Sequence, residues 1–380
     1  MKIGNIAGKL ALSAALFGAA LTGAHAEDFK IGLIGPMTGP AAPWGAAARV
    51  SMEILADKVN AKGGLDVGGT KYQVKIVTYD DQYKASEAVA AYNRLTTQDG
   101  VKIIVIQVSA PTMALKQNLE DDKIIGFTTS YTAAAIDDKT KFLFRGYSTA
   151  NDFMPPYAEW MAKNLKEKKM ATLNPNDETG WAQKKTTEAL YQKVGFTVVD
   201  GELYERSVKD FAPLITKVMA YSPEVIDLGA SSPATVGLII RQAREAGYKG
   251  RFVQTGGAGW VEAVQAAGKE ATEGMVNILY ADPDNAAFQG VVAEYKKRMN
   301  GQQPNEMVSV YTDLMSVILA SVQKAGTIDD TTKIAAAVPA ALPLTSLQGT
   351  EMTYAPQQIR TWDYIGVLTD GRPKVAGKVK

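Results

Sequence analysis

Short apolar runs alternate with longer amphipathic segments along most of the chain. The runs 29–35 and 101–108 have the length of strands, and the second is almost continuously apolar, which is typical of a buried parallel strand. The segments 44–64 and 109–122 that follow them are amphipathic and have helical length. Strands and helices in alternation predict an α/β fold.

The alternation restarts after the stretch FLFRGYSTAND, which ends at Asp152. Two doubly wound units in succession, with tail segments left over, predict two lobes joined by more than one crossover. The other predicted strands are 72–81, 123–129, 168–174, 196–204, 224–230 and 251–256, with terminal strands near 346–354 and 361–371, and the other predicted helices are 84–99, 179–195, 211–223, 233–250, 286–300 and 305–325.

The first 26 residues have the features of a secretory signal peptide. Lys2 and Lys9 give a basic start, residues 10–23 form an apolar stretch, and Ala24-His25-Ala26 is a small-x-small cleavage signal. The apolar stretch is well short of the roughly 20 residues that span a bilayer, which argues against a membrane anchor. We therefore expect export to the periplasm, with cleavage after Ala26.

Cleavage at that point changes what chemistry the chain can perform. The mature chain keeps 39 basic residues (41 minus Lys2 and Lys9) against 40 acidic ones, and a charge of −1 argues against a nucleic-acid partner. The single histidine, His25, is removed, and there is no cysteine. Ser-His-Asp and Cys-His catalysis and His/Cys zinc sites are thereby excluded, whereas carboxylate-only and lysine-based chemistry remain open.

Several motifs in order resemble the periplasmic leucine/isoleucine/valine-binding proteins, the solute receptors of branched-chain-type ABC importers. The resemblance covers essentially the whole mature chain, and no one motif decides it. The motifs are IGLIGPMTGPAAPWG (31–45), DKVNAKGGL (57–65), VTYDDQY (77–83), the Ser-x-x-Thr of QVSAPT (107–112), FRGYSTANDF (144–153) and GLIIRQAREAGYKGRF (237–252).

This resemblance implies two Rossmann-like lobes joined by three crossovers, the type I periplasmic binding protein fold. Lobe 1 would hold residues 27–147 and 277–352, and lobe 2 would hold residues 148–276 and 353–380. The ligand would lie in the cleft between the lobes, which close around it by a hinge motion. It also implies two membrane permease subunits as partners, a monomeric receptor and no catalytic activity.

Hydroxyl residues after two predicted strands form a candidate carboxylate site. Ser109 opens a helix, where it could cap the helix or, with free backbone N–H groups, bind an anion. Ser130, Tyr131 and Thr132 follow the next strand on the same carboxyl edge of the sheet, where open α/β sheets bind ligands. The resemblance implies that Ser109 contacts a ligand carboxylate and that Ser130 and Thr132 stand at the two positions that hold the carboxylate and the ammonium of an amino acid, while Tyr131 could point either way.

Trp44 closes the loop GPMTGPAAPWG (35–45). Glycine and proline fix the path of this loop, and the indole offers a flat apolar surface at little entropic cost. A buried core tryptophan is the alternative. The resemblance implies an aromatic wall of the cleft at this position.

Lobe 2 departs from the family pattern at three positions. Gly256 stands where many amino-acid receptors of the family carry an acidic residue that neutralises the ligand ammonium, and Thr179 and Ser232 replace aromatic residues. An ammonium without a partner in a closed cleft is very costly. Asp177 or Glu178 could supply a charge, but neither occupies the expected place.

These departures lead to the hypothesis of a carboxylate ligand with an apolar or aromatic body, such as an aromatic acid or keto acid, and without an α-amino group. A branched-chain or other hydrophobic amino acid is the alternative ligand. Other protein classes are an exported hydrolase using the acidic pairs at 80–81 or 121–122, and a signalling ectodomain. No cofactor is predicted, because GGAGWVE (256–262) has Glu262 where a dinucleotide fingerprint needs its third glycine.

Overall fold

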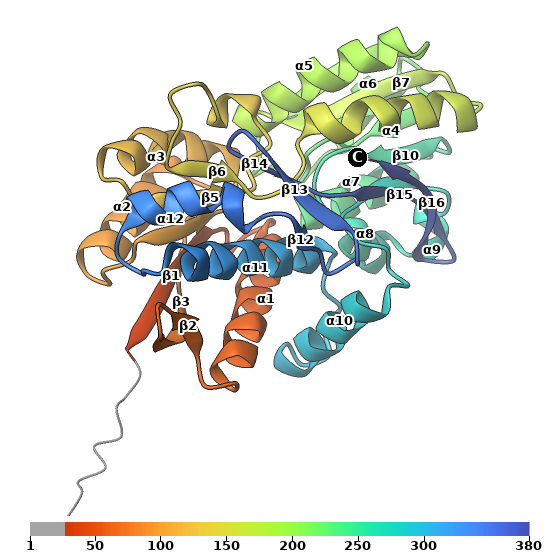
Figure 1. Cartoon of the computed structure of the whole chain (residues 1–380). Helices are drawn as coiled ribbons and strands as arrows, with labels where there is room; N and C mark the ends of the chain where they lie inside the picture. Colours follow the sequence, from red (N-terminus) through yellow and green to blue (C-terminus); the bar gives the residue numbers. More distant parts are fainter. Residues whose placement is uncertain (1–26, 380) are drawn as a thin grey trace, which may run out of the picture.

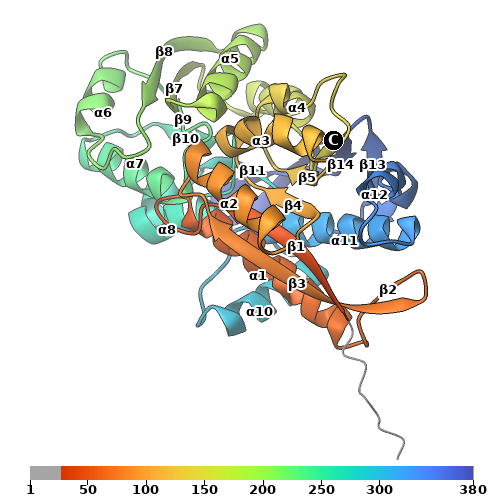
Figure 2. The same cartoon turned by 90° about the vertical axis from the view of Figure 1, so that its left-hand side faces the viewer.

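The computed structural model describes residues 27–379, which form two α/β lobes (Figures 1 and 2). The predicted signal peptide, residues 1–26, lies outside the described residues. Among residues 27–379, every helix is too short or too polar to cross a membrane.

Lobe 1 is built on a nine-stranded sheet in the order β12-β13-β14-β6-β5-β4-β1-β3-β2. The strands from β6 to β3 pair in parallel, and β2, β12 and β13 add antiparallel pairings at the two edges. The strands are β1 (Asp28–Gly35), β2 (Leu65–Val67), β3 (Thr70–Asp80), β4 (Ile103–Ile106), β5 (Ile125–Thr128), β6 (Leu143–Arg145), β12 (Leu344–Thr345), β13 (Glu351–Ala355) and β14 (Gln358–Arg360).

Helices cover both faces of this sheet, as alternate residues of β4 show. Ile103 and Val105 belong to the core shared with α1 and α11, whereas Ile104 and Ile106 belong to the core under α2 and α3. A strand buried on both faces needs the continuous apolar run that the sequence has there. The helices of lobe 1 are α1 (Ala42–Asn60), α2 (Ala85–Thr97), α3 (Ser109–Asp121), α10 (Ala286–Arg298), α11 (Met307–Ala325) and α12 (Thr331–Ala337).

Lobe 2 repeats this plan with a seven-stranded sheet in the order β16-β15-β11-β10-β9-β7-β8. Its strands are β7 (Lys169–Pro175), β8 (Thr197–Tyr204), β9 (Val225–Asp227), β10 (Arg251–Gln254), β11 (Val276–Leu279), β15 (Asp363–Thr369) and β16 (Arg372–Val379), and its helices are α4 (Ala150–Asn164), α5 (Glu178–Lys193), α6 (Ala212–Met219), α7 (Pro233–Glu245), α8 (Trp260–Ala267) and α9 (Lys269–Thr272).

The chain passes between the lobes three times, from β6 to α4, from β11 to α10 and from β14 to β15. Two crossovers lie later than predicted. The resemblance places residues 277–279 in lobe 1, but β11 pairs with β10 and β15 of lobe 2. It places residues 353–360 in lobe 2, but β14 pairs with β13 and β6 of lobe 1. The pattern of apolar residues can predict that a short segment is a strand. It cannot predict which sheet the strand joins, because that depends on the strands with which it pairs.

The crossover segments are tied to one another beside the cleft. The Ser148 hydroxyl donates to the Thr361 carbonyl at 3.0 Å, and it accepts from the Thr361 N–H at 3.3 Å. The rings of Tyr147 and Tyr280 meet edge to face with their centres 5.7 Å apart. These contacts hold the three crossover segments together where the chain passes between the lobes.

Candidate functional site

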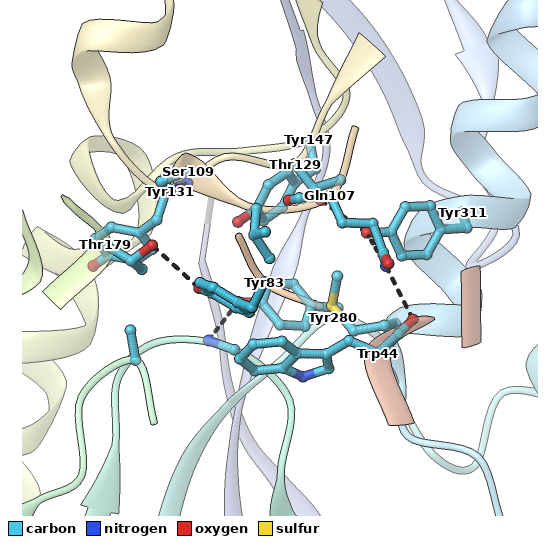
Figure 3. A pocket seen from close by; sticks show the side chains of 14 residues that line it. Trp44, Tyr83, Gln107, Ser109, Thr129, Tyr131, Tyr147, Thr179, Tyr280 and Tyr311 are labelled. Carbon is cyan, nitrogen blue, oxygen red and sulfur yellow. Dashed lines mark hydrogen bonds between the residues drawn. The ribbon is translucent and has the colours of Figure 1, made fainter. Parts of the chain in front are cut away.

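A cavity lies between the lobes, and it comprises about 470 Å³ of unoccupied space that is partly open to solvent (Figure 3). Most of the lobe 1 residues around it follow the carboxyl ends of β3, β4 and β5, the sheet edge where ligands bind in open α/β folds. The lining residues are Trp44, Tyr83, Gln107, Val108, Ser109, Thr129, Tyr131, Tyr147, Thr179, Ala230, Gly257, Tyr280, Met307 and Tyr311.

Ser109 is the centre of the lobe 1 side of the cavity. Its Oγ accepts from the backbone N–H groups of Tyr131 at 3.1 Å and Thr132 at 3.4 Å, and the Ser130 hydroxyl donates to it at 3.2 Å. The N-cap of α3 is Val108, so Ser109 does not cap its helix. The serine hydroxyl instead joins the start of α3 to the loop after β5, and its own proton can be donated to a group in the cavity.

A buried guanidinium stands behind that loop. Arg145 is 2% exposed, and it donates from Nη2 to the Thr132 carbonyl at 2.8 Å and from Nη1 to the Ser130 carbonyl. Burial lowers the pKa of Arg145 from its ordinary value, but an arginine remains protonated at neutral pH. Its charge fixes the loop 130–132 and favours a negative group on the cavity side of that loop. The sequence reasoning missed this residue.

The polar lining continues from Gln107 to the helix α11. Gln107 donates from Nε2 to the Trp44 carbonyl at 3.0 Å and to the Tyr311 hydroxyl at 2.9 Å (Figure 3). The Thr129 hydroxyl bonds the Gln107 carbonyl at 2.7 Å and lies 2.8 Å from the Tyr311 oxygen. These contacts hold one wall of the cavity rigid through uncharged groups.

Trp44 joins the two lobes. Its indole Nε1 donates to the Ala258 carbonyl of lobe 2 at 2.8 Å, and its ring packs on Gly257. Gly257 has φ of +75°, and a Cβ there would lie 2.6 Å from the indole Cζ2. Only glycine allows this contact, so the indole both walls the cavity and bridges the lobes.

Gly256 and Ser232 do not line the cavity. A Cβ at Gly256 would meet Gln183 and Ala230, while its neighbour Gly257 reaches the cavity. The Ser232 hydroxyl is buried and accepts from Arg206 Nη1 at 2.9 Å. Ser130 and Thr132 likewise lie one layer back from the surface of the cavity, beside Ser109. Of the residues predicted from the sequence, Trp44, Ser109, Tyr131 and Thr179 line it.

Arg206 lies on the lobe 2 side of the cleft, where its charge is compensated by the Asp177 carboxylate. The sequence reasoning missed this residue also. Its Nε pairs with the Asp177 carboxylate, its Nη2 donates to the Tyr83 hydroxyl of lobe 1 at 2.8 Å, and its guanidinium stacks 3.9 Å from the Tyr83 ring centre. Tyr83 Oη lies 3.3 Å from Thr179 Oγ1 (Figure 3). Asp177 is therefore committed to Arg206 and to the start of α5, and it does not face the cavity as a free charge.

No acidic or basic side chain is found among the described residues that line the cavity. Two buried carboxyl groups lie behind them. Burial raises the pKa of Asp81 to about 7 and that of Asp227 to about 6, and both carboxylates accept hydrogen bonds from protein groups. Burial also raises the pKa of Tyr83 and Tyr131, which keeps both phenols protonated. The cavity is an uncharged, largely aromatic space with hydroxyl and amide groups at one end.

Two lobes, three crossovers and a cleft lined in this way define a periplasmic solute-binding protein. The family model described as periplasmic binding protein matches residues 28–361. A leucine-, isoleucine-, valine-, threonine- and alanine-binding protein from Pseudomonas aeruginosa is 30% identical over 327 residues, which are 84% of this chain and 85% of the relative. The chain belongs to this family, as a receptor of the Leu/Ile/Val-binding type.

Solved structures show the same fold. A leucine-binding protein from Thermotoga maritima superposes with a TM-score of 0.80 at 21% identity, over 92% of this chain and 98% of the other. A solute-binding protein from R. palustris in complex with benzoate superposes with a TM-score of 0.79 at 19% identity, over 92% of this chain and 96% of the other. The predicted fold class is confirmed.

Proposed function

We propose that this chain is a periplasmic receptor that delivers a small carboxylate with an apolar or aromatic body, and without an α-amino group, to an ABC importer. Aromatic acids and keto acids belong to this class. The receptor binds its solute without transforming it, works as a monomer and docks on two permease subunits. It binds no nucleic acid, and export with cleavage after Ala26 places it in the periplasm.

The observation that carries this proposal is the charge of the cavity. A carboxylate would meet the Ser109 hydroxyl on the lining, with the charge of Arg145 behind the loop 130–132. An ammonium would meet no carboxylate on the lining, and the carboxyl groups behind it are engaged by protein donors: Asp177 by Arg206, and Asp81 and Asp227 by backbone N–H and hydroxyl groups. The desolvation cost of an unpaired ion therefore falls on the ammonium and not on the carboxylate.

The relatives leave two ligand classes in competition. The Pseudomonas aeruginosa relative is named as an amino-acid-binding protein, and the R. palustris structure contains benzoate. A branched-chain or other hydrophobic amino acid is therefore the second candidate ligand. The uncharged lobe 2 side of the cavity favours the first class.

A hydrolase built on paired carboxylates receives no support from the arrangement of the acidic pairs. Asp80 accepts from the Met37 N–H at 2.9 Å and from the Thr38 hydroxyl at 2.6 Å. Asp122 accepts from the Tyr92 hydroxyl at 2.8 Å, and neither pair lines the cavity. These carboxylates shape loops and helix ends.

Calorimetric titration of the purified protein with benzoate and with L-leucine tests the ligand class. The proposal predicts binding of the aromatic acid, and it fails if leucine binds tightly and the aromatic acid does not. Mass spectrometry of the solute released after denaturation tests the second part of the proposal. A receptor returns the compound unchanged, and the appearance of a product would show an enzyme.

A further inference from the structure

Five tyrosines line the cavity between the lobes, and the protein uses the hydroxyl groups of only some of them. Three of these hydroxyls have side-chain partners: Tyr83 has Arg206 and Thr179, Tyr311 has Gln107 and Thr129, and Tyr131 has Gln183. The other two hydroxyls belong to Tyr147 and Tyr280, which are 6% and 4% exposed (Figure 3).

The hydroxyl protons of Tyr147 and Tyr280 have no acceptor among the described residues. The Tyr280 oxygen accepts from the Gly257 N–H at 3.3 Å, and this contact leaves the Tyr280 proton free. The Tyr147 hydroxyl forms no hydrogen bond within the described part of the chain. A buried hydroxyl normally has a partner, so the acceptor for each proton has to come from whatever fills the cavity.

These two phenols come from the segments that join the lobes. Tyr147 follows β6 at the first crossover, and Tyr280 directly follows β11 at the second. Their rings meet edge to face with their centres 5.7 Å apart, so the two side chains are neighbours. Neighbouring side chains therefore supply two proton donors at the crossover end of the cavity.

The acid-binding end of the cavity lies close to Tyr147. The Ser109 oxygen accepts from the N–H groups of Tyr131 and Thr132, so its own proton is available to a carboxylate. Arg145 bonds a carbonyl of the same loop and is also near the Tyr147 hydroxyl, since burial raises the pKa of that phenol and the Arg145 charge lowers it in part. A ligand group bound by Tyr147 is therefore near the carboxylate of the same ligand.

The chemistry of this pair favours a ligand oxygen without a proton of its own. A ligand that fills the closed cleft displaces the water that could accept from the two phenols. A hydrocarbon group in that place would leave both hydroxyl protons buried and unpaired, which is unfavourable. An ammonium has only protons to donate, whereas a carbonyl oxygen has two lone pairs and can accept from both phenols.

We propose that Tyr147 and Tyr280 form a second polar subsite of the cavity, which selects carboxylates with a keto oxygen over carboxylates without one. This inference rests on the proposed function, and it narrows the ligand class to keto acids. Ser109 binds the acid group, the two phenols bind the keto oxygen, and the aromatic walls surround the apolar body.

The test compares ligands that differ only in the keto oxygen. One pair is phenylpyruvate and 3-phenylpropanoate, and the other is 4-methyl-2-oxopentanoate and 4-methylpentanoate. Both pairs are titrated calorimetrically into the wild-type protein at pH 7. In the pair that binds more tightly, the keto acid should have about a tenfold or larger advantage in affinity, because only the keto acid supplies an acceptor to the phenols.

Variants of the two tyrosines assign this advantage to the hydroxyl groups. Tyr147→Phe and Tyr280→Phe keep the rings and their edge-to-face contact and remove one proton donor each. Each variant should lower the affinity ratio about threefold, and the double variant should bring it close to one, while the ligand without the keto oxygen binds no more weakly than before. Tyr221→Phe, at a tyrosine that is 50% exposed, is the control and should keep the wild-type ratio.

The outcomes separate this inference from the proposed function. If the wild type binds both members of a pair equally, or if the double variant keeps the wild-type ratio, the subsite is wrong and the proposed function stands. If the double variant does not fold, an unchanged ratio in both single variants contradicts the subsite in the same way. If the wild type binds L-leucine tightly and none of these four acids, the proposed function itself fails.

Discussion

The two sides of the cleft differ in the state of their arginines. Arg145, behind the lobe 1 side, forms no ion pair with a carboxylate among the described residues, whereas Arg206, on the lobe 2 side, forms one with Asp177. Arg145 bonds two carbonyls of the loop 130–132, and Arg206 bonds the Asp177 carboxylate. In the proposed function, the two sides serve different parts of one ligand. Lobe 1 offers donors and positive potential to an acid group, and lobe 2 offers an uncharged surface to the rest of the molecule.

Trp44 belongs to lobe 1 and contacts Ala258 and Gly257 of lobe 2. Because it also lines the cavity, its substitution should have the largest effect on ligand binding. Trp44→Ala removes the wall, the bond to Ala258 and the contact with Gly257. We expect about a 100-fold loss of ligand affinity, the size typical of a buried aromatic anchor. Calorimetry measures the loss, and Trp181→Ala, at a tryptophan that is 52% exposed, is the control. Equal losses in the two variants would contradict the role of Trp44.

The lobe 1 side is tested next through Ser109. Ser109→Ala removes the hydroxyl that organises the loop 130–132 and faces the cavity, and we expect about a tenfold loss of affinity for carboxylate ligands. Ser321→Ala is a matched control, because that buried serine bonds only its own helix. Unchanged carboxylate binding in Ser109→Ala would show that lobe 1 does not grip the acid group.

The contact between the two sides is tested by Tyr83→Phe. The variant keeps the ring on Arg206 and removes the hydroxyl that accepts from Arg206 and lies beside Thr179. Loss of one interlobe hydrogen bond should weaken binding about fivefold, through a faster dissociation rate. Stopped-flow release kinetics measure this rate. A slower rate in the variant would mean that the bond opposes closure.

The last prediction concerns Glu306, whose carboxyl group lies between the lobes but outside the cleft. Substituting it should change ligand affinity least of the four and should change the stability of the fold clearly. Glu306 is 4% exposed, and burial raises its pKa to about 8, which a hydrogen bond with Trp260 offsets only in part. Its neighbours include Glu262, whose pKa is raised to about 7 by burial, and farther out Tyr295 and Arg49.

Because the folded-state pKa of this acid is above its unfolded value, wild-type stability should fall as pH rises from about 4.5 to about 8. Glu306→Gln removes this dependence, so its melting temperature should exceed that of the wild type by a few degrees at pH 8 and by less at pH 5. Glu270→Gln, at an exposed position, is the control. A difference between variant and wild type that does not change with pH would contradict the assignment.

The alternation of predicted strands and helices gave most of the fold. The reason is that the spacing of apolar residues along a segment reflects which of its faces is buried, and this differs between a strand and a helix. Helix α4 was missed because Pro155 and Pro156 lie inside it and normally end a helix. The Thr149–Asp152 pair, in which the Asp152 carboxylate accepts from the Thr149 N–H at 2.7 Å, was the signal that could have found its start. The crossover positions depend on strand pairing and could not be read from local pattern.

The two sides of the cleft differed in how far the sequence predicted them. Ser109 and the loop 130–132 follow consecutive strands, so their meeting at one sheet edge follows from topology. Arg206 and Gln183 do not line the cavity, and their hydrogen bonds to Tyr83 and Thr255 join segments that are distant in sequence. Contacts of this kind leave no periodic signal, which is why these residues were missed while Trp44 and Thr179 were found through the family resemblance.

The central proposal is that the cleft stabilises a ligand carboxylate and has no carboxylate on its lining to pair with an ammonium. The most direct measurement is the pair of dissociation constants of the wild-type protein at pH 7 for 3-phenylpropanoate and L-phenylalanine, which have the same skeleton with and without the amino group. The account predicts that 3-phenylpropanoate binds at least about tenfold more tightly. Tighter binding of phenylalanine would contradict it.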